Sequence, residues 1–118
     1  MKFVSTRGDA PTVGIDDALV AGLAPDGGLY VPESIPAIDL ATPRATLVDT
    51  AVVTLAPWFA GSRLESQLAD LCATAFAFDA PLRPLTGPGD HLLELFHGPT
   101  AAFKDYAARF LAGALGAL

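Results

Sequence analysis

The end of the chain constrains the fold most, because a short apolar segment, a tight turn and a helix-forming run follow one another there. Residues 91–96 (HLLELF) have the length and apolar character of a strand, and residues 97–100 (HGPT) are typical of a turn. Residues 101–118 are rich in Ala and Leu, which predicts a helix. Strand, turn and helix open a βα unit, which needs neighbouring parallel strands. No further strand follows, so we expect a piece of a longer α/β protein.

A second interpretation of the same segment stays open. The predicted last helix is apolar over much of its circumference, as if something should cover it. A second copy of the chain could provide that cover. We therefore expect residues 91–118 to expose apolar faces through which the chain self-associates.

The preceding residues predict short elements in an α+β arrangement. We expect strands at residues 3–8 and 29–31, and an irregular, proline-rich connection at 32–43. Apolar spacing and helix-terminal residues predict helices at 15–22, 45–56 and 64–77, the last with Ser62 as its cap. Residues 79–90 are rich in Pro and Gly and are the best candidate for a linker. We divide the chain into a small N-terminal helical domain (1–88) and the start of an α/β domain (89–118).

Composition excludes several classes of function. The chain has seven Lys and Arg and thirteen Asp and Glu, which gives a net charge of −6. Because its few cations are also scattered along the sequence, nucleic acid is not an expected partner. The chain has one cysteine and hence no internal disulfide. The apolar run at 110–118 has nine residues, whereas a membrane span needs about 20. With no secretory signal at the N-terminus, we expect a cytoplasmic protein that does not contact a membrane.

Lys104 is the leading candidate for a catalytic group. It lies near the predicted start of the last helix, where the partial positive charge of the helix terminus disfavours a second cation. On a helix it would share a face with Ala107, Ala108 and Leu111, and such apolar neighbours also favour the uncharged amine. An uncharged amine is what condensation with a carbonyl group requires. The alternative is that Lys104 is a surface charge, as most lysines are.

Other polar and aromatic residues are best interpreted as structural. Asp105 and Arg109 are spaced for an i,i+4 ion pair. Cys72 falls in an apolar stripe and is expected to be buried and inert. His97 precedes a turn, where a role in packing is favoured over substrate contact, and with His91 it lacks the partners of a metal site. The remaining candidates are the ridge Phe103, Tyr106 and Phe110, expected in the core, and the turn at 25–28 (PDGG), too common to indicate an anion site.

Three stretches together resemble threonine synthase. They are residues 5–8 (STRG), residues 22–32 (GLAPDGGLYVP) and residues 94–105 (ELFHGPTAAFKD), in matching order and spacing. The last stretch is the most specific. The resemblance covers essentially the whole chain, but it corresponds to about the first quarter of such an enzyme.

This resemblance implies an enzyme that depends on pyridoxal 5'-phosphate and has the fold type of the tryptophan synthase β chain. Threonine synthase converts O-phospho-L-homoserine and water into L-threonine and phosphate. The family's Schiff-base lysine falls on Lys104, which would hold the cofactor aldehyde, release it to the substrate amine and shuttle protons. The family's glycine-rich phosphate loop and the hydroxyl that binds the ring nitrogen would come from sequence beyond residue 118. We therefore expect an N-terminal fragment that is inactive alone. The alternative is a non-catalytic helical module that serves in association.

Overall fold

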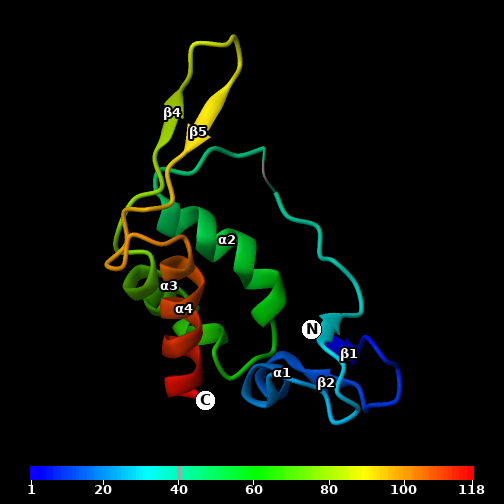
Figure 1. Ribbon diagram of the computed structural model, residues 1–118. Coiled ribbons are helices and arrows are strands. Elements are labelled where there is room, and N and C mark those ends of the chain that lie inside the picture. The colour runs from blue at the N-terminus through cyan, green and yellow to red at the C-terminus, as the bar shows by residue number, and fades with distance from the viewer. Residues whose placement is uncertain (40) are drawn as a thin grey trace.

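Helices and strands are mixed along residues 1–39 and 41–118, the part of the chain described by the computed structural model (Figure 1). The mixed α and β class expected from the sequence is confirmed. In chain order the elements are β1 (Lys2–Ser5), β2 (Val13–Gly14), α1 (Ile15–Ala21), β3 (Tyr30–Pro32), α2 (Leu47–Phe59), the 3-10 turn η1 (Glu65–Gln67), α3 (Leu68–Ala75), β4 (Leu82–Pro84), β5 (His91–Leu93) and α4 (Lys104–Ala117).

A small antiparallel sheet in the order β2-β1-β3 begins the fold. In its register Phe3 lies opposite Val13, and Val4 lies opposite Val31. The predicted strands at 3–8 and 29–31 are therefore present with shifted ends. Strand β2 was not predicted, because two residues are too few to show an alternating pattern.

The helices follow local signals with small shifts at their ends. A capping box starts α2, in which the Asp49 amide donates to the Thr46 hydroxyl (3.0 Å) and the Thr46 amide donates to the Asp49 carboxylate (3.1 Å). The helix continues through Pro57 to Phe59, beyond the predicted end at residue 56, and buries the Phe59 side chain. The predicted helix 64–77 becomes η1 followed by α3, whose N-cap residues are Leu64 and Gln67, so the predicted cap at Ser62 is wrong. The Ser62 hydroxyl accepts from the Leu64 amide (2.9 Å) in the turn before η1.

The core lies where α1, α2, α3 and α4 meet. Cys72 and Leu64 are fully buried within it, and burial raises the pKa of the Cys72 thiol, as expected of an inert cysteine. Phe110 packs edge-on against Phe59 with ring centroids 5.8 Å apart, so its predicted place in the core is confirmed. Phe103 is 65% exposed, so its predicted core position is wrong. The buried core residues are Ile15, Phe59, Leu64, Leu68, Cys72 and Ala114.

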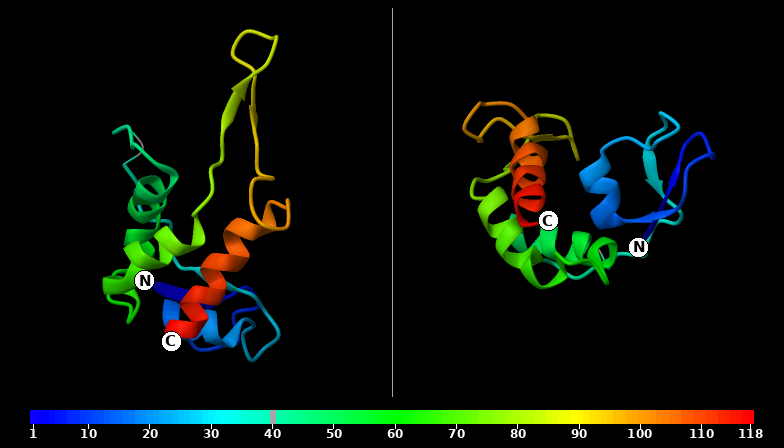
Figure 2. Two further views of the ribbon diagram at one scale, coloured as in Figure 1. Left: turned by 90° about the vertical axis from the view of Figure 1, so that its left-hand side faces the viewer. Right: turned by 90° about the horizontal axis from the view of Figure 1, so that it is seen from below.

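Strand β5 departs most from expectation. It pairs antiparallel with β4, with Leu82 opposite Leu93, instead of opening a parallel βα unit. The predicted linker at 79–90 therefore contains one strand of a hairpin, which projects from the helices in Figures 1 and 2. The radius of gyration is 16.3 Å, against about 13.5 Å for a compact domain of this length, consistent with this projection.

None of the helices in residues 1–39 and 41–118 is long and apolar enough to cross a membrane.

Candidate functional site

Lys104 is the first residue of α4, and its side chain is exposed. Ala107, Ala108 and Leu111 on the same face are exposed as well, so the apolar cover expected around the amine is not supplied by the described residues. Within residues 1–39 and 41–118, the amine has no hydrogen-bond or ion-pair partner. An accessible and unpaired primary amine can be reached by an aldehyde, and condensation then also requires the amine to be uncharged.

A tight loop, residues 98–103, leads into this lysine. The Ala101 amide donates to the Gly98 carbonyl (3.0 Å), and the Asp105 amide donates to the Ala102 carbonyl (3.1 Å). Ala101 has a φ of 54°, a left-handed conformation that costs energy for a residue with a Cβ. The helix therefore starts at Lys104, three residues later than the predicted run at 101–118.

The Asp105 carboxylate closes this loop. The Thr100 amide donates to Oδ2 of Asp105 (2.8 Å), and the Thr100 hydroxyl donates to Oδ1 (2.8 Å). These two bonds, the amide bond first, hold the pKa of Asp105 below its ordinary value. Asp105 is 8% exposed, so the carboxylate faces inward while the neighbouring Lys104 faces outward. Phe103, which precedes the helix, provides no side-chain cap, and Asp105 binds the loop in its place.

Gly98 packs directly against the same carboxylate. A Cβ at this position would lie 2.5 Å from Oδ2 of Asp105 and 2.7 Å from its Cβ. The φ of Gly98 is not among the positive values in the chain, so space and not backbone conformation calls for glycine here. Gly98, Thr100 and Asp105 thus form one unit, which we call the Asp105 clamp.

Arg109 joins α4 to the end of α3. Its Nε donates to the Ala75 carbonyl (3.1 Å) and its Nη2 donates to the Thr74 carbonyl (2.9 Å). The predicted Asp105–Arg109 ion pair is therefore wrong. The guanidinium instead donates to backbone carbonyl groups at the C-terminus of α3, which have no partner within that helix. The Tyr106 hydroxyl donates to the Asp79 carbonyl (2.8 Å) and adds a second link to the same region.

His97 is engaged by a neighbouring carboxylate. Its Nε2 lies 2.7 Å from the Glu94 carboxylate, whose other oxygen lies 3.5 Å from Nε of Arg83. The Phe96 ring stacks on the imidazole, with centroids 4.7 Å apart. The packing role favoured for His97 agrees with these contacts. Arg83 gave no signal in the sequence, because its partner lies across a hairpin that was not predicted.

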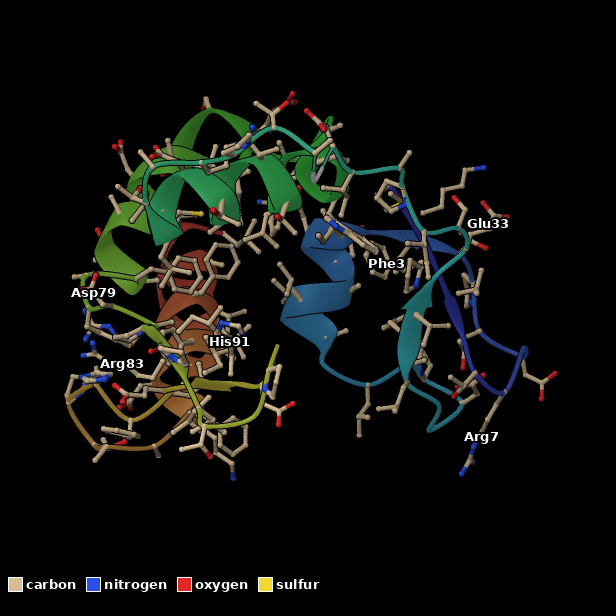
Figure 3. The ribbon with its side chains drawn as sticks, turned by 90° about the horizontal axis from the view of Figure 1, so that it is seen from above. Phe3, Arg7, Glu33, Asp79, Arg83 and His91 are labelled. Carbon is tan, nitrogen blue, oxygen red and sulfur yellow. The ribbon has the colours of Figure 1, made fainter. Side chains whose placement is uncertain are left out.

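A second polar cluster fixes the N-terminal sheet. The Asp26 carboxylate accepts from the Ser5 hydroxyl (2.7 Å) and from the Gly28 amide (2.9 Å), and both bonds lower its pKa. Arg7 donates to the Asp26 carbonyl (2.9 Å). Figure 3 shows Arg7 at the outer edge of the sheet, well away from Arg83 on the hairpin side. The turn at 25–28 is thus a structural crosslink, distant from Lys104.

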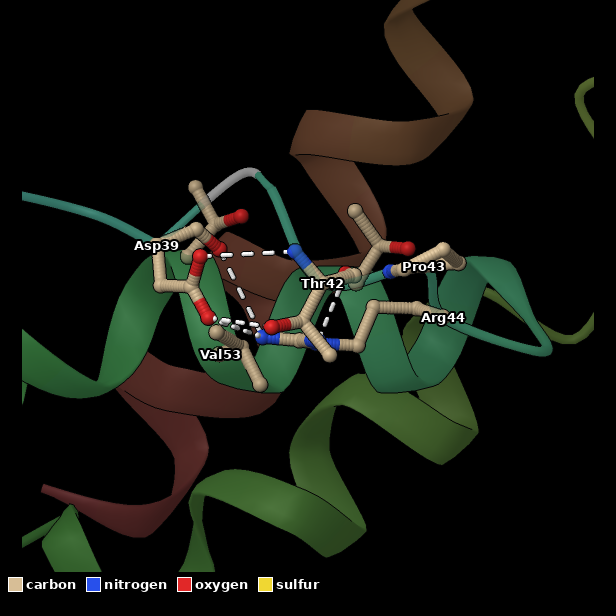
Figure 4. Close-up of a pocket in the computed structure, with 7 residues that line it drawn as sticks. Asp39, Thr42, Pro43, Arg44 and Val53 are labelled. Carbon is tan, nitrogen blue, oxygen red and sulfur yellow. Dashed lines mark hydrogen bonds and ion pairs between the residues drawn. The ribbon is translucent and has the colours of Figure 1, made fainter.

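A surface hollow beside α2 is lined by Asp39 and Arg44, whose side chains lie 3.5 Å apart (Figure 4). The Asp39 carboxylate accepts from the Thr42 hydroxyl (2.7 Å) and the Ala41 amide (3.0 Å), which lower its pKa. These polar groups are satisfied by one another. Among the described residues, no group of three His, Cys, Asp or Glu is placed to hold a metal ion.

Pyridoxal phosphate has an aldehyde, a ring nitrogen and a phosphate to be held. The unpaired amine of Lys104 fits the aldehyde.

Comparison with known proteins gives one consistent answer. A family model described as "Threonine synthase N terminus" matches residues 2–76. The threonine synthase of Pseudomonas aeruginosa is 42% identical over 94% of this chain and 25% of its own length. That of Saccharomyces cerevisiae is 36% identical over 92% of this chain and 24% of its own length.

Solved structures agree. The PLP-bound threonine synthase from Brucella melitensis superposes with a TM-score of 0.84 at 39% identity, over 98% of this chain and 28% of that one. The Escherichia coli threonine synthase gives a TM-score of 0.75 at 31% identity, with the same coverage. The chain spans about a quarter of the length of these relatives. It belongs to the threonine synthase family.

Proposed function

We propose that the chain is the N-terminal part of an enzyme that converts O-phospho-L-homoserine and water into L-threonine and phosphate. In this proposal residues 1–88 form the N-terminal domain, and residues 89–118 begin the cofactor-binding catalytic domain. The small-molecule substrate is the partner, and the compartment is the cytoplasm. Support comes from the relatives, which carry the name threonine synthase, and from one of them that is PLP-bound.

Lys104 is the residue that bonds the cofactor in this proposal. The supporting observation is its unpaired, exposed amine at the first position of α4, directly after a loop held by the Asp105 clamp. When bound, pyridoxal phosphate supplies the electron sink that makes the substrate α-proton removable. The Lys104 amine then holds that proton at Nζ and returns it to substrate carbon. The first-turn position also places the helix N-terminus beside the amine.

The test of this role uses the complete enzyme that carries these residues. Pyridoxal phosphate is added, borohydride fixes it to the amine that holds it, and peptide mass mapping locates the modified lysine. The sequence has one other lysine, Lys2, so Lys2→Arg is the matched control for Lys104→Arg. We expect Lys104 to be labelled in the wild type and in Lys2→Arg. In Lys104→Arg we expect both the label and the visible absorbance of the bonded cofactor to be lost. Label at any other amine instead, whether Lys2, the N-terminus or a lysine beyond residue 118, would refute the assignment.

The isolated 118-residue chain is inactive in this proposal. It has the amine, but the cofactor phosphate and ring are held by residues that the family places further along the chain. Incubation of the purified chain with pyridoxal phosphate and O-phospho-L-homoserine is expected to release no phosphate. Threonine formed above the level of a Lys104→Arg sample would contradict this.

A second candidate is a non-catalytic association module. It is favoured by the exposed apolar side chains of residues 91–118, among them Leu93 (51% exposed), Phe96 (55%) and Leu115 (44%). Such a module self-associates through these faces. Sedimentation of the chain, compared with a Leu93→Ser, Leu115→Ser variant, separates the candidates, since loss of dimer in the variant supports association. A reading frame that continues beyond Leu118 into a glycine-rich α/β region supports the enzyme instead.

A further inference from the structure

The Asp105 clamp lies one residue from Lys104, although neither Asp105 nor Thr100 forms a hydrogen bond or ion pair with its amine. Both oxygens of Asp105 are occupied by Thr100, through the amide and the hydroxyl at 2.8 Å each. The clamp therefore fixes where the loop 98–103 ends and where the first turn of α4 begins.

Successive residues on a helix point about 100° apart, so the direction of one side chain sets that of the next. Asp105 is held inward by its two bonds and by the close approach of Gly98. Lys104 then points about 100° away from Asp105 around the helix axis, and its side chain is exposed. The helix has no N-cap side-chain bond. Tyr106 and Arg109 link α4 to residues 74–79, whereas the Asp105 clamp links its first turn to the loop 98–103. Ala101, in its left-handed conformation, is a place where the loop relaxes if the clamp is lost.

We propose that Asp105 is a positioning residue for Lys104, acting through its two hydrogen bonds to Thr100. The clamp sets the rotation of the first turn of α4 and thereby aims the Lys104 amine at the cofactor aldehyde. This inference rests on the proposed function of Lys104.

The test compares Thr100→Val with Thr100→Ser in the complete enzyme. Valine keeps the shape of threonine and the backbone bond but removes the hydroxyl bond, whereas serine keeps both bonds. We expect Thr100→Val to slow borohydride-trapped bonding of pyridoxal phosphate at Lys104 and to lower kcat by about tenfold, because a displaced reacting group costs up to about a hundredfold. KM is expected to change by less than about threefold, since in this proposal Thr100 acts on the position of Lys104 and not on substrate binding. Thr100→Ser is expected to retain wild-type values.

Ser62→Ala is the control for stability. The Ser62 hydroxyl also bonds an aspartate, Asp16, and a backbone amide, that of Leu64, at the far end of the core from Lys104. It is expected to lower the melting temperature but to leave trapping and kcat unchanged. Asp105→Ala, which removes both clamp bonds, is expected to exceed the Thr100→Val effect. If Asp105→Ala does not fold, the comparison of Thr100→Val with Thr100→Ser still tests the positioning role.

The outcomes are distinct. Absence of trapped cofactor on Lys104 in the wild type overturns the proposed function. Trapping on Lys104 with Thr100→Val equal to Thr100→Ser overturns the positioning role alone. An equal loss of kcat in Ser62→Ala and Thr100→Val also overturns it, because the effect would then be one of general stability.

Discussion

Replacing Gly98 by alanine tests the packing of the Asp105 clamp directly. The added Cβ would lie 2.5 Å from Oδ2 of Asp105, about 0.9 Å inside ordinary contact at 3.4 Å. The carboxylate has little freedom to retreat, because Thr100 binds both of its oxygens. Over-packing of this kind costs about 1–3 kcal/mol, so we expect Gly98→Ala to lower the free energy of unfolding by that amount.

The measurement is urea denaturation followed by helical circular dichroism, with a matched glycine as control. Gly116 lies in α4, and a Cβ there would meet nothing within 4 Å. Gly116→Ala is therefore expected to raise the free energy of unfolding by about 0.5–1 kcal/mol, the helix preference of alanine over glycine. The same chemical change then has opposite signs at two positions, because Gly98 has no room for a Cβ whereas Gly116 has room and a helical backbone.

A double-mutant cycle assigns the effect to its cause. The Cβ of Asp105 would itself lie 2.7 Å from the new methyl group, so Asp105→Ala relieves only part of the overlap, whereas Asp105→Gly removes the three nearest atoms. In the Asp105→Gly background, Gly98→Ala is expected to cost little, since the cycle isolates the pairwise term. A Gly98→Ala protein as stable as the wild type, or a cost unchanged by Asp105→Gly, would refute the packing argument.

Three further predictions concern the hydrophobic core and the stability of the chain at acid pH. Leu64→Ala is expected to lower the free energy of unfolding by about 3–4 kcal/mol, within the range for a buried leucine. Ile35 is 81% exposed, so Ile35→Ala is expected to change that free energy by less than about 0.5 kcal/mol. Equal urea midpoints for the two variants would contradict this prediction. The pKa of Asp26 is lowered by hydrogen bonds from Ser5 and Gly28, so its stabilisation is present above pH 3.8 and is lost as the pH falls through the lowered value. Asp26→Asn should make the free energy of unfolding less dependent on pH below about pH 4. A pH dependence equal to that of the wild type would argue against this role of Asp26. Cys72 is fully buried, so a thiol reagent should label it only at the rate of unfolding, and rapid labelling of the folded chain would be the contrary result.

Local signals predicted most helices well. The apolar stripe from Leu47 to Leu55 placed α2, because apolar spacing is a property of neighbouring residues. The capping box at Thr46 that starts this helix was not predicted. The hairpin was not predictable in this way. Its strands are three residues each, one carries Pro84, and the pairing of Leu82 with Leu93 depends on a contact made across a turn.

In the candidate site, too, local features were predictable from the sequence and contacts between distant segments were not. Lys104 was singled out from its place in the sequence, and its role stays a prediction. The apolar cover expected around it was wrong for this chain, because cover depends on which segments pack against a helix face. The Asp105–Arg109 pair was wrong for a related reason: helical spacing allows the pair, but the Thr100 amide and the Ala75 carbonyl are nearer partners.

Ala114 has a consequence for how this protein is dissected. It belongs to α4, yet it is fully buried among Ile15, Leu64 and Cys72, while the recognised family segment stops at residue 76. An excised piece ending there would leave a hole in its hydrophobic interior where α4 had lain. Such a piece should behave as a partly molten chain, and peptides supplying residues 104–118 in trans should restore its cooperative melting.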